Sequence, residues 1–400
     1  MKKRTEQDKA FKIFFNHTAN AGVAYYRMFN YATYMSKEKN VSLAASQFQP
    51  MNQQIADWEL ALENPEYAKQ HNMSREKILD DFDMLMDMCD IAVWQVCHTA
   101  MSFALFNLYI DKYKGKKPIV MEVDDHLFGV NPENAGFSSY HPNSDNEYFA
   151  EMQLRNSNYV IVSTNWLRDG DGVSNGLLNY NKHIEVVKNS IDFNIWDKVK
   201  NETNPDKIRI GWAGGQAHYH DLRIMEKVMP EILKKYPNVE FAFLGGMPDY
   251  MKTSRRIKFI GKWFGIMDYP TELGKQGFDI GIAPLKDNLF NRAKSNLRYL
   301  EYSALKIPTV ASPVTPFKEC ENIILAQEPQ EWIDELSGLI EDKQYRIYKG
   351  EESYKEVKEK YNVERTAHRY LKLLKRIANG RISTNKVITQ MRGNPFVERK

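Results

Sequence analysis

Cysteine is scarce in this chain of 400 residues, and its three thiols, Cys89, Cys97 and Cys320, are scattered. So few thiols exclude a disulfide framework or a thiolate zinc site and favour small buried side chains. No apolar run approaches the roughly 18 residues of a membrane-spanning helix, and the N-terminal segment lacks the features of a secretory signal. Internal repeats and low-complexity segments are missing too. We therefore expect a soluble, cytoplasmic protein without a transmembrane segment.

The net charge of +3 is small, but the charges are unevenly distributed. Residues 361–400 hold ten lysines and arginines against two glutamates, a net charge of +8 that leaves −5 for the rest of the chain. Such a basic segment can contact nucleic acid, an anionic membrane or an acidic lobe, although a solvated basic face is its commonest explanation. Residues 51–90 carry ten acidic residues against three basic ones, which predicts an acidic helical insertion.

The chain is longer than the roughly 250 to 300 residues at which one hydrophobic core stops growing, so we expect two domains. Short apolar, β-branched runs alternate with helical patterns, as in parallel βαβ units, which predicts an α/β fold with two Rossmann-like, doubly wound domains. We expect the first domain at 1–188, a linker at 189–206, the second domain at 207–360, and a C-terminal helix with a basic tail at 361–400.

The predicted strands lie at 11–15, 41–45, 91–96, 118–123, 159–163 and 184–188 in the first half, and at 207–212, 239–244, 257–260, 279–283 and 308–311 in the second. Three helices are predicted at 328–340, 343–359 and 363–379. Ligands of open α/β sheets bind beyond the carboxyl ends of the strands. We therefore expect the functional site in a cleft that both domains face, formed by the loops that follow the strands.

The segment 279–312 is the most informative of these loops. Its strand is predicted to end at Pro284, and a helix to open near Ser295, which is a plausible N-cap. The free N–H groups at Ser295 and Asn296 and the helix dipole form an anion site, to which Lys294 adds a charge. Glu301, about two turns further on, can accept hydrogen bonds from a ribose diol. From this segment alone, an equally good interpretation is that Lys294 and Glu301 are exposed helix residues that bind no ligand.

The stretch LRYLEYSALKIPTVAS, 297–312, closely resembles the closing motif of the family-four retaining glycosyltransferases of GT-B fold. The resemblance implies two Rossmann-like domains facing a cleft, with C-terminal helices that pack back toward the N-terminal domain. It also implies that Glu301 binds the ribose of a nucleotide sugar. The family's first glutamate, eight positions earlier, is replaced by Ala293, with Lys294 and Ser295 following.

Three further stretches extend the resemblance over most of the chain. VVKNSIDFNIW, 186–196, is similar to the start of the family's interdomain linker. IRIGWAGGQAHYHDL, 208–222, is similar to the first strand and glycine-rich loop of its nucleotide-binding domain, where Gly214 and Gly215 allow close backbone approach. The passage that begins at residue 257 also resembles the family, and the resemblance implies that Gly261 and Lys262 line the nucleotide pocket. His218, His220 and Asp221 fit no helical zinc motif, and we expect Asp221 to cap a helix.

The N-terminal half should supply the acceptor side. Gly22 lies in the loop after the first strand and matches the family's glycine-containing loop near the transferred sugar; Arg27 follows and either binds phosphate or forms a surface ion pair. The segment MEVDDHLF, 121–128, places acids at the end of a buried strand, where they are costly without a functional reason. Asp125 or His126 can orient the acceptor hydroxyl and remove its proton. A metal-binding pair of Asp124 and Asp125 is the weaker alternative.

The resemblance implies a glycosyltransferase that is retaining and needs no cofactor or essential divalent metal. Lys294, the amides at Ser295 and Asn296, and Arg27 or Lys262 would stabilise the leaving phosphate of the nucleotide sugar. The acceptor would be a glycan, a lipid-linked glycan or, in a bacteriophage-type branch acting in the host cytoplasm, hydroxymethylated DNA that suits the basic segment. A non-catalytic GT-B-like binding protein and a nucleotide-sugar epimerase are the alternatives.

Overall fold

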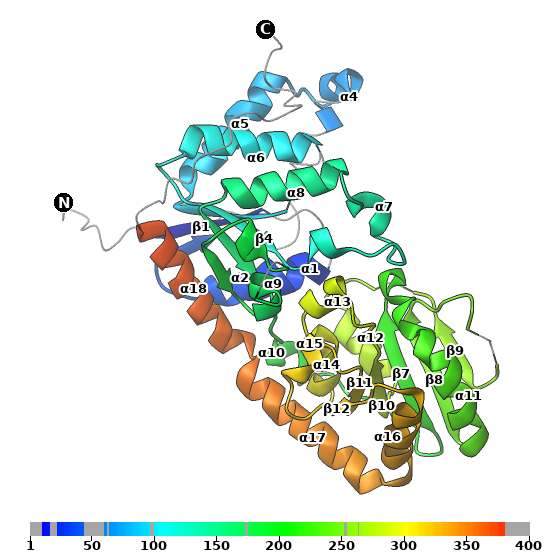
Figure 1. Cartoon of the computed structure of the whole chain (residues 1–400). Helices are drawn as coiled ribbons and strands as arrows, with labels where there is room; N and C mark the ends of the chain where they lie inside the picture. Colours follow the sequence, from blue (N-terminus) through cyan, green and yellow to red (C-terminus); the bar gives the residue numbers. More distant parts are fainter. Residues whose placement is uncertain are drawn as a thin grey trace. The chain divides into compact units, whose positions relative to one another are not determined.

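The computed structural model describes residues 10–16, 22–43, 60–61, 64–96, 100–172, 175–251, 254–262 and 264–380. They divide into two compact units, shown in Figure 1. Unit 1 contains described residues of Met1–Asp124, Pro142–Val187 and Glu364–Lys400, and unit 2 contains those of Asp125–His141 and Lys188–Val363. Within the described ranges, no helix combines the length and apolar character that crossing a bilayer requires.

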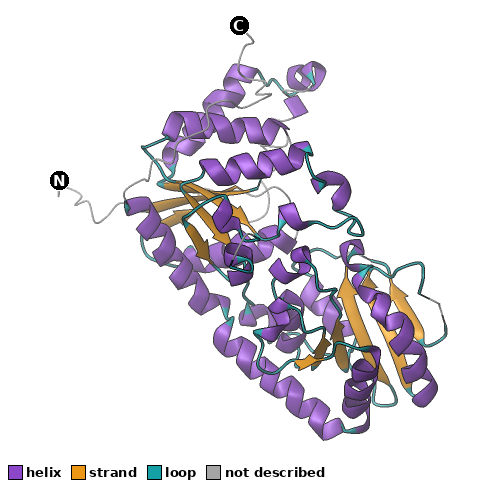
Figure 2. Cartoon of the chain, viewed as in Figure 1, coloured by secondary structure: helices purple, strands orange, loops and turns teal. Residues whose placement is uncertain are grey.

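Unit 1 is built on a parallel sheet of six strands in the order β2-β1-β3-β4-β5-β6. Its strands are β1 (Phe11–Asn16), β2 (Val41–Leu43), β3 (Ile91–Gln95), β4 (Ile119–Val123), β5 (Tyr159–Val162) and β6 (Ile184–Val186). Every residue of β3 and β4 is buried, as expected for parallel strands that helices cover on both faces (Figure 2). The polar side chains Gln95 and Glu122 on these strands therefore stand out.

Helices connect the strands of unit 1. They are α1 (Gly22–Ala24), α2 (Asn30–Met35), α4 (Pro65–Gln70), α5 (Arg75–Met88), α6 (Ala100–Tyr113), α8 (Asp145–Asn156), α9 (Asn165–Asp169) and most of α18 (Val363–Asn379). A π-helical turn, Tyr25–Phe29, joins α1 to α2. Ser144 is the N-cap of α8, and its Oγ accepts the N–H of Glu147 at 3.2 Å, which satisfies one of the unpaired donors of the first turn.

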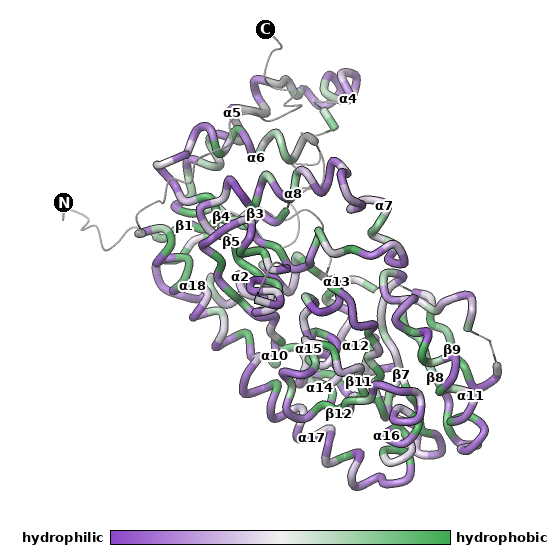
Figure 3. The backbone as a smooth tube through the Cα atoms, in the orientation of Figure 1, coloured by the Kyte–Doolittle hydropathy of each residue, from purple (hydrophilic) through white to green (hydrophobic). Residues whose placement is uncertain are grey.

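Unit 2 contains a second parallel sheet in the order β12-β11-β10-β7-β8-β9. Its strands are β7 (Ile208–Gly214), β8 (Val239–Gly245), β9 (Ile257–Ile260), β10 (Ile280–Ala283), β11 (Thr309–Ala311) and β12 (Ile324–Leu325). One hydrophobic core unites the strands with their helices; it includes Ile210, Phe241, Ile282 and Trp332. Figure 3 shows the apolar character of the strands against the more polar outer helices.

The helices of unit 2 are α7 (Phe137–Tyr140), α10 (Phe193–Trp196), α11 (Met225–Lys235), α12 (Tyr269–Lys275), α13 (Leu289–Ala293), α14 (Leu297–Ala304), α15 (Thr315–Lys318), α16 (Pro329–Glu341) and α17 (Lys343–Lys360). The predicted α/β class, the eleven predicted strands and the three C-terminal helices are confirmed to within a few residues. Only β12 was missed among the described strands, because two residues carry no recognisable period.

The predicted division of the chain differs from the observed units, because residues 125–141, expected in the first domain, and the expected linker 189–206 both belong to unit 2. Helix α18 belongs to unit 1 from Glu364 on, as expected for a C-terminal helix that returns to the first domain. The described part of the acidic stretch 51–90 includes α4 and α5, which lie in the crossover from β2 to β3. Within the basic segment, residues 381–400 lie outside the described residues.

Candidate functional site

The strand order of unit 2 reverses between β7 and β10, which pair in parallel through Ile280 with Ile210 and Gly281 with Gly211. Ligands of open α/β sheets bind at such a switch point, beyond the carboxyl ends of the strands. Helix α14 packs closely against β10, because a Cβ on Gly281 would lie 2.4 Å from the Tyr302 ring. The Tyr302 hydroxyl accepts the N–H of Ala213 at 2.9 Å, so α14 is tied to the end of β7.

Asp221 joins the loop after β7 to the loop after β10. Its carboxylate is buried and accepts the backbone N–H of Lys286 at 2.9 Å and the side-chain amide of Asn291 at 2.8 Å. His218 Nδ1 lies 2.9 Å from its second oxygen. The prediction that Asp221 caps a helix is wrong: the residue opens a 3-10 turn and its carboxylate reaches across to the neighbouring loop instead. Asp221 therefore fixes the loop that leads to α13 and Lys294.

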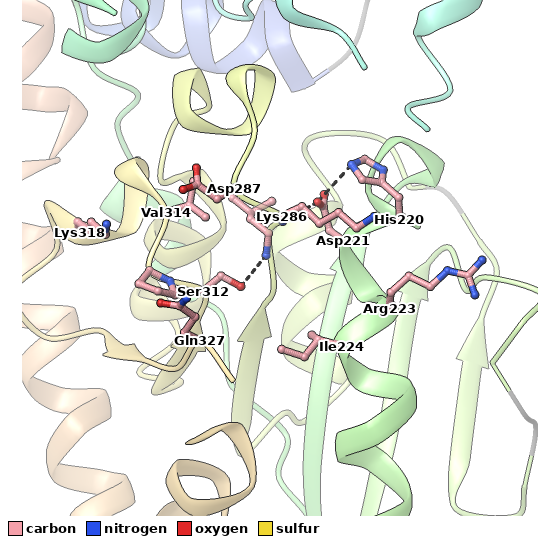
Figure 4. A pocket seen from close by; sticks show the side chains of 12 residues that line it. His220, Asp221, Arg223, Ile224, Lys286, Asp287, Ser312, Val314, Lys318 and Gln327 are labelled. Atoms are coloured by element: carbon pink, nitrogen blue, oxygen red, sulfur yellow. Dashed lines mark hydrogen bonds and ion pairs between the residues drawn. The ribbon is translucent and has the colours of Figure 1, made fainter. Parts of the chain in front are cut away.

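A cavity of about 350 Å³ lies at the same edge of the sheet, between the loops that follow β7, β10, β11 and β12 (Figure 4). Pockets of this size are typical of small-molecule sites. Ser312, from the PTVAS stretch, lines the cavity, and its Oγ accepts the N–H of Leu285 at 2.9 Å. The remaining lining residues are His220, Asp221, Arg223, Ile224, Leu285, Lys286, Asp287, Pro313, Val314, Lys318 and Gln327. Of the residues predicted to bind the donor or to catalyse transfer, none lines it.

Lys294 and Asp125 form an ion pair, with 2.8 Å between Nζ and Oδ2. The two side chains are 20% and 29% exposed, so both remain accessible to a ligand. The ammonium also lies 4.3 Å from the centroid of the Phe290 ring. Lys294 follows α13 and Asp125 comes shortly after β4, and both belong to unit 2. The structure thus brings together two side chains that were predicted to be catalytic from segments 169 residues apart.

The helix after Lys294 begins at Leu297 with Asn296 as its N-cap, so the prediction of a Ser295 cap is wrong by one residue. Ser295 Oγ instead accepts the side-chain amide of Asn189 at 2.9 Å. Asn296 makes no side-chain bond to the first turn; its amide contacts Cys320 Sγ at 3.3 Å. The first N–H groups of an α-helix have no partner within the helix, so the start of α14 favours an anion.

Glu301 is buried on α14, where it contacts Arg298 of the same helix and Tyr269 of α12. Its Oε2 accepts an N–H of Arg298 at 2.9 Å and the hydroxyl of Tyr269 at 3.2 Å. Burial and then the charge of Glu301 hold the pKa of Tyr269 well above its usual value. Burial opposes the charge on Arg298, but Tyr269 and Glu301 outweigh it and raise the pKa of Arg298. The sequence analysis missed Arg298, although its spacing of three from Glu301 places both on one helix face.

The predicted surface ion pair of Arg27 is wrong, and its buried guanidinium is not open to a phosphate. Its side chain is 1% exposed, and Nε lies 2.5 Å from Oε1 of Glu122, whose side chain is 0% exposed. A further N–H of Arg27 donates to the carbonyl of Val187 at 2.6 Å. Burial opposes the charge of the guanidinium, but Glu122 outweighs it and raises the pKa of Arg27. Arg27 is therefore part of the interior of unit 1.

The other predicted site residues are more dispersed. His126 is buried, and its carbonyl accepts the N–H of Gly129 at 2.9 Å. Lys262 is exposed after β9, with Nζ 5.1 Å from the Phe264 ring centroid. Gly22 opens α1, but the loop before it, 17–21, lies outside the described residues.

Gly214 ends β7, where a Cβ would lie 2.5 Å from the Trp212 ring. Close packing with Trp212 therefore explains this glycine. Gly215 follows in extended conformation, before the 3-10 turn Gln216–His218. Among the described residues, no group of three His, Cys, Asp or Glu side chains is placed to hold a metal ion.

No protein-family model and no curated protein sequence matches the chain. Among solved structures, it is similar to HepE of Anabaena in complex with UDP and glucose, with 14% identity and a TM-score of 0.60 over 92% of this chain and 99% of HepE. It is similar to TarM, with 15% identity and a TM-score of 0.53 over 72% of this chain, and spans 55% of TarM. A putative UDP-N-acetylglucosamine 2-epimerase of Listeria monocytogenes matches with 13% identity and a TM-score of 0.51 over 92% of this chain and 96% of the epimerase. These likenesses confirm the GT-B type of fold.

Proposed function

We propose that the chain is a glycosyltransferase that moves a sugar from a nucleoside diphosphate donor to an acceptor hydroxyl. The observation that carries this proposal is the contact of Lys294 with Asp125 at the carboxyl edge of the second sheet. Sugar transfer needs a positive charge for the leaving phosphate and a base for the acceptor proton. The pair supplies both groups in one partly open place.

The donor's diphosphate would lie against Lys294 and the first turn of α14. Negative charge builds on the leaving phosphate as the bond to the sugar breaks, and a lysine and helix amides stabilise that charge without a metal ion. We therefore propose that transfer needs no essential divalent metal. Lys294 would exchange its partner from the Asp125 carboxylate to the phosphate, at little cost because both side chains are partly exposed.

Asp125 would then accept the proton of the attacking hydroxyl. Its carboxylate gains a free lone pair when the lysine turns to the donor. We propose transfer with retention of the anomeric configuration, which rests on the resemblance to the family-four enzymes. Glu301 would bind the ribose, since a carboxylate can accept more hydrogen bonds than the two from Arg298 and Tyr269.

A nucleotide-sugar epimerase is the second candidate, because the Listeria epimerase has the same type of fold. The two functions differ in one requirement, since an epimerase needs no acceptor.

The acceptor classes also differ in their dependence on salt. Binding to hydroxymethylated DNA would involve the basic segment 361–400 and weaken steeply with salt, whereas a neutral glycan would bind independently of salt.

The test has two steps. A thermal-shift panel of UDP-, GDP-, ADP- and dTDP-sugars identifies the donor, because a ligand of the native state raises the melting temperature. Release of nucleoside diphosphate is then followed with and without glycan, lipid-linked glycan and hydroxymethylated DNA. Acceptor-dependent release supports a glycosyltransferase. Conversion of the sugar without an acceptor supports the epimerase, and the absence of any shift overturns both.

A further inference from the structure

The chain passes between the two units at four places: after Asp124, His141, Val187 and Val363. Arg27 holds the unit 1 side of two of these connections. It bonds Glu122, two residues before the first connection, at 2.5 Å, and the carbonyl of Val187, the last residue before the third, at 2.6 Å. One planar guanidinium thus fastens the ends of β4 and β6.

The same two connections lead directly to the candidate site. Three residues after Glu122 comes Asp125, which pairs with Lys294 at 2.8 Å. Two residues after Val187 comes Asn189, whose side-chain amide donates to Ser295 Oγ at 2.9 Å. Asp125, the first residue beyond one connection, and Asn189, the second residue beyond the other, therefore contact adjacent residues, Lys294 and Ser295.

The surroundings of Arg27 show how its side chain is held. Arg27 lies in the π-helical turn Tyr25–Phe29, a rare geometry that often marks functional positions. Tyr370 of α18 packs against Tyr31, with 5.2 Å between ring centroids, and both tyrosines lie close enough to raise the pKa of Arg27. Tyr370 belongs to the segment that follows the fourth connection.

An arginine is suited to this place because its fork can bond two acceptors at once, whereas a lysine offers a single point charge. Burying a charged pair gives little net stability compared with apolar side chains of similar volume. A role in fixing geometry therefore explains the pair better than a role in stability alone.

We propose that Arg27 is a positioning residue for the site: by fixing both connections, it sets Asp125 and Asn189 against Lys294 and Ser295. The expected effect of Arg27 on turnover rests on the proposed sugar transfer. Its effect on the two connections does not. Arg27 acts through Glu122 and Val187 and touches neither donor nor acceptor.

The test compares three variants of the full chain by amide hydrogen exchange and by turnover. Arg27→Met with Glu122→Met removes both charges and keeps similar volume, so neither charge is left buried without its partner. Arg27→Lys keeps the charge but cannot serve both acceptors. Leu154→Ala, in the buried part of α8, is the control that lowers stability away from the connections.

In the double variant we expect exchange about tenfold faster at 188–190 and 294–296, with β8 and β10 unchanged, and turnover lowered at least tenfold. In Arg27→Lys only the connection at 188–190 should exchange faster. Leu154→Ala should leave 294–296 as in the wild type. Wild-type exchange at 294–296 in the double variant overturns the positioning role. If the wild type itself transfers no sugar, the proposed function fails, while the exchange result still decides the structural part.

Discussion

Two ion pairs, one in each unit, invite comparison. Arg27 and Glu122 are sealed inside unit 1, with side chains 1% and 0% exposed, whereas Lys294 and Asp125 in unit 2 are 20% and 29% exposed. The sequence analysis selected Arg27, Lys294 and Asp125 alike as catalytic residues. Their surroundings separate them, because only the open pair can exchange one partner for a ligand.

Burial separates ion-pair residues with a structural role from those with a chemical role. Removing one member of a sealed pair leaves an uncompensated charge in the interior, which costs far more than the pair contributes. An exposed pair contributes little, so losing it hardly affects folding. Removing one member of the sealed pair should therefore affect folding, and removing one member of the open pair should affect chemistry.

The largest expected effect is on stability. Arg27→Ala should lower the free energy of unfolding by about 3–5 kcal/mol, because Glu122 is left buried without its partner. Lys294→Ala should lower it by less than about 1 kcal/mol. Urea unfolding followed by circular dichroism measures both. Equal losses in the two variants would break the comparison.

The open pair should dominate turnover. Lys294→Ala should lower kcat about 10²- to 10³-fold, because the leaving phosphate loses its positive charge. Asp125→Asn should lower it about 10²- to 10⁴-fold through loss of the base. Lys306→Ala, which removes an exposed lysine paired with Glu351, is the matched control and should leave kcat unchanged. Wild-type turnover in both site variants would remove this assignment.

Glu301→Gln should have a smaller effect, confined to the donor. It replaces the charged acceptor of the ribose by a weaker neutral one, so the donor KM should rise about tenfold with kcat nearly unchanged. Glu351→Gln, on the exposed surface, serves as the control. Initial-rate kinetics at varied donor concentration separate KM from kcat, and a fall in kcat alone would place Glu301 outside the ribose site.

The smallest effect concerns pH. Burial lowers the pKa of His220, which faces Asp221, His218, Lys286 and Glu133; of these, the carboxylates oppose the shift. The unfolded state therefore binds a proton more readily, so the stability contribution is present above pH 6.5 and is lost as the pH falls toward the folded pKa. His220→Asn should show a flatter loss of stability between pH 7 and pH 5 in urea unfolding. An unchanged slope would contradict this role.

The strands, and the places of Lys294 and Asp125 in loops after strands, could be predicted from sequence because they depend on local signals; the contact between the two side chains was not predicted. Buried parallel strands read as continuous apolar runs, and residues that follow such strands gather at one edge of the sheet. Lys294 and Asp125 both follow strands in this way. Their spacing along the chain gave no measure of the distance between them.

Other features depend on partners far away in sequence. The residues near Arg27 in the sequence do not indicate its partner Glu122, which lies 95 residues later, so a buried pair was not expected. Asp221 was expected to cap a helix, because the side-chain amide that it bonds belongs to Asn291, 70 residues away in the sequence. The shift of the α14 cap from Ser295 to Asn296 depends on Asn189, which draws the serine hydroxyl away.

Isothermal titration with UDP, GDP, ADP and dTDP tests whether Lys294 binds the diphosphate of the donor. We expect that at least one of these nucleotides binds the wild type, that Lys294→Met weakens this binding at least tenfold, and that Lys306→Met leaves it unchanged. Equal affinity of the wild type and Lys294→Met, or no binding of any of the four, would contradict this expectation.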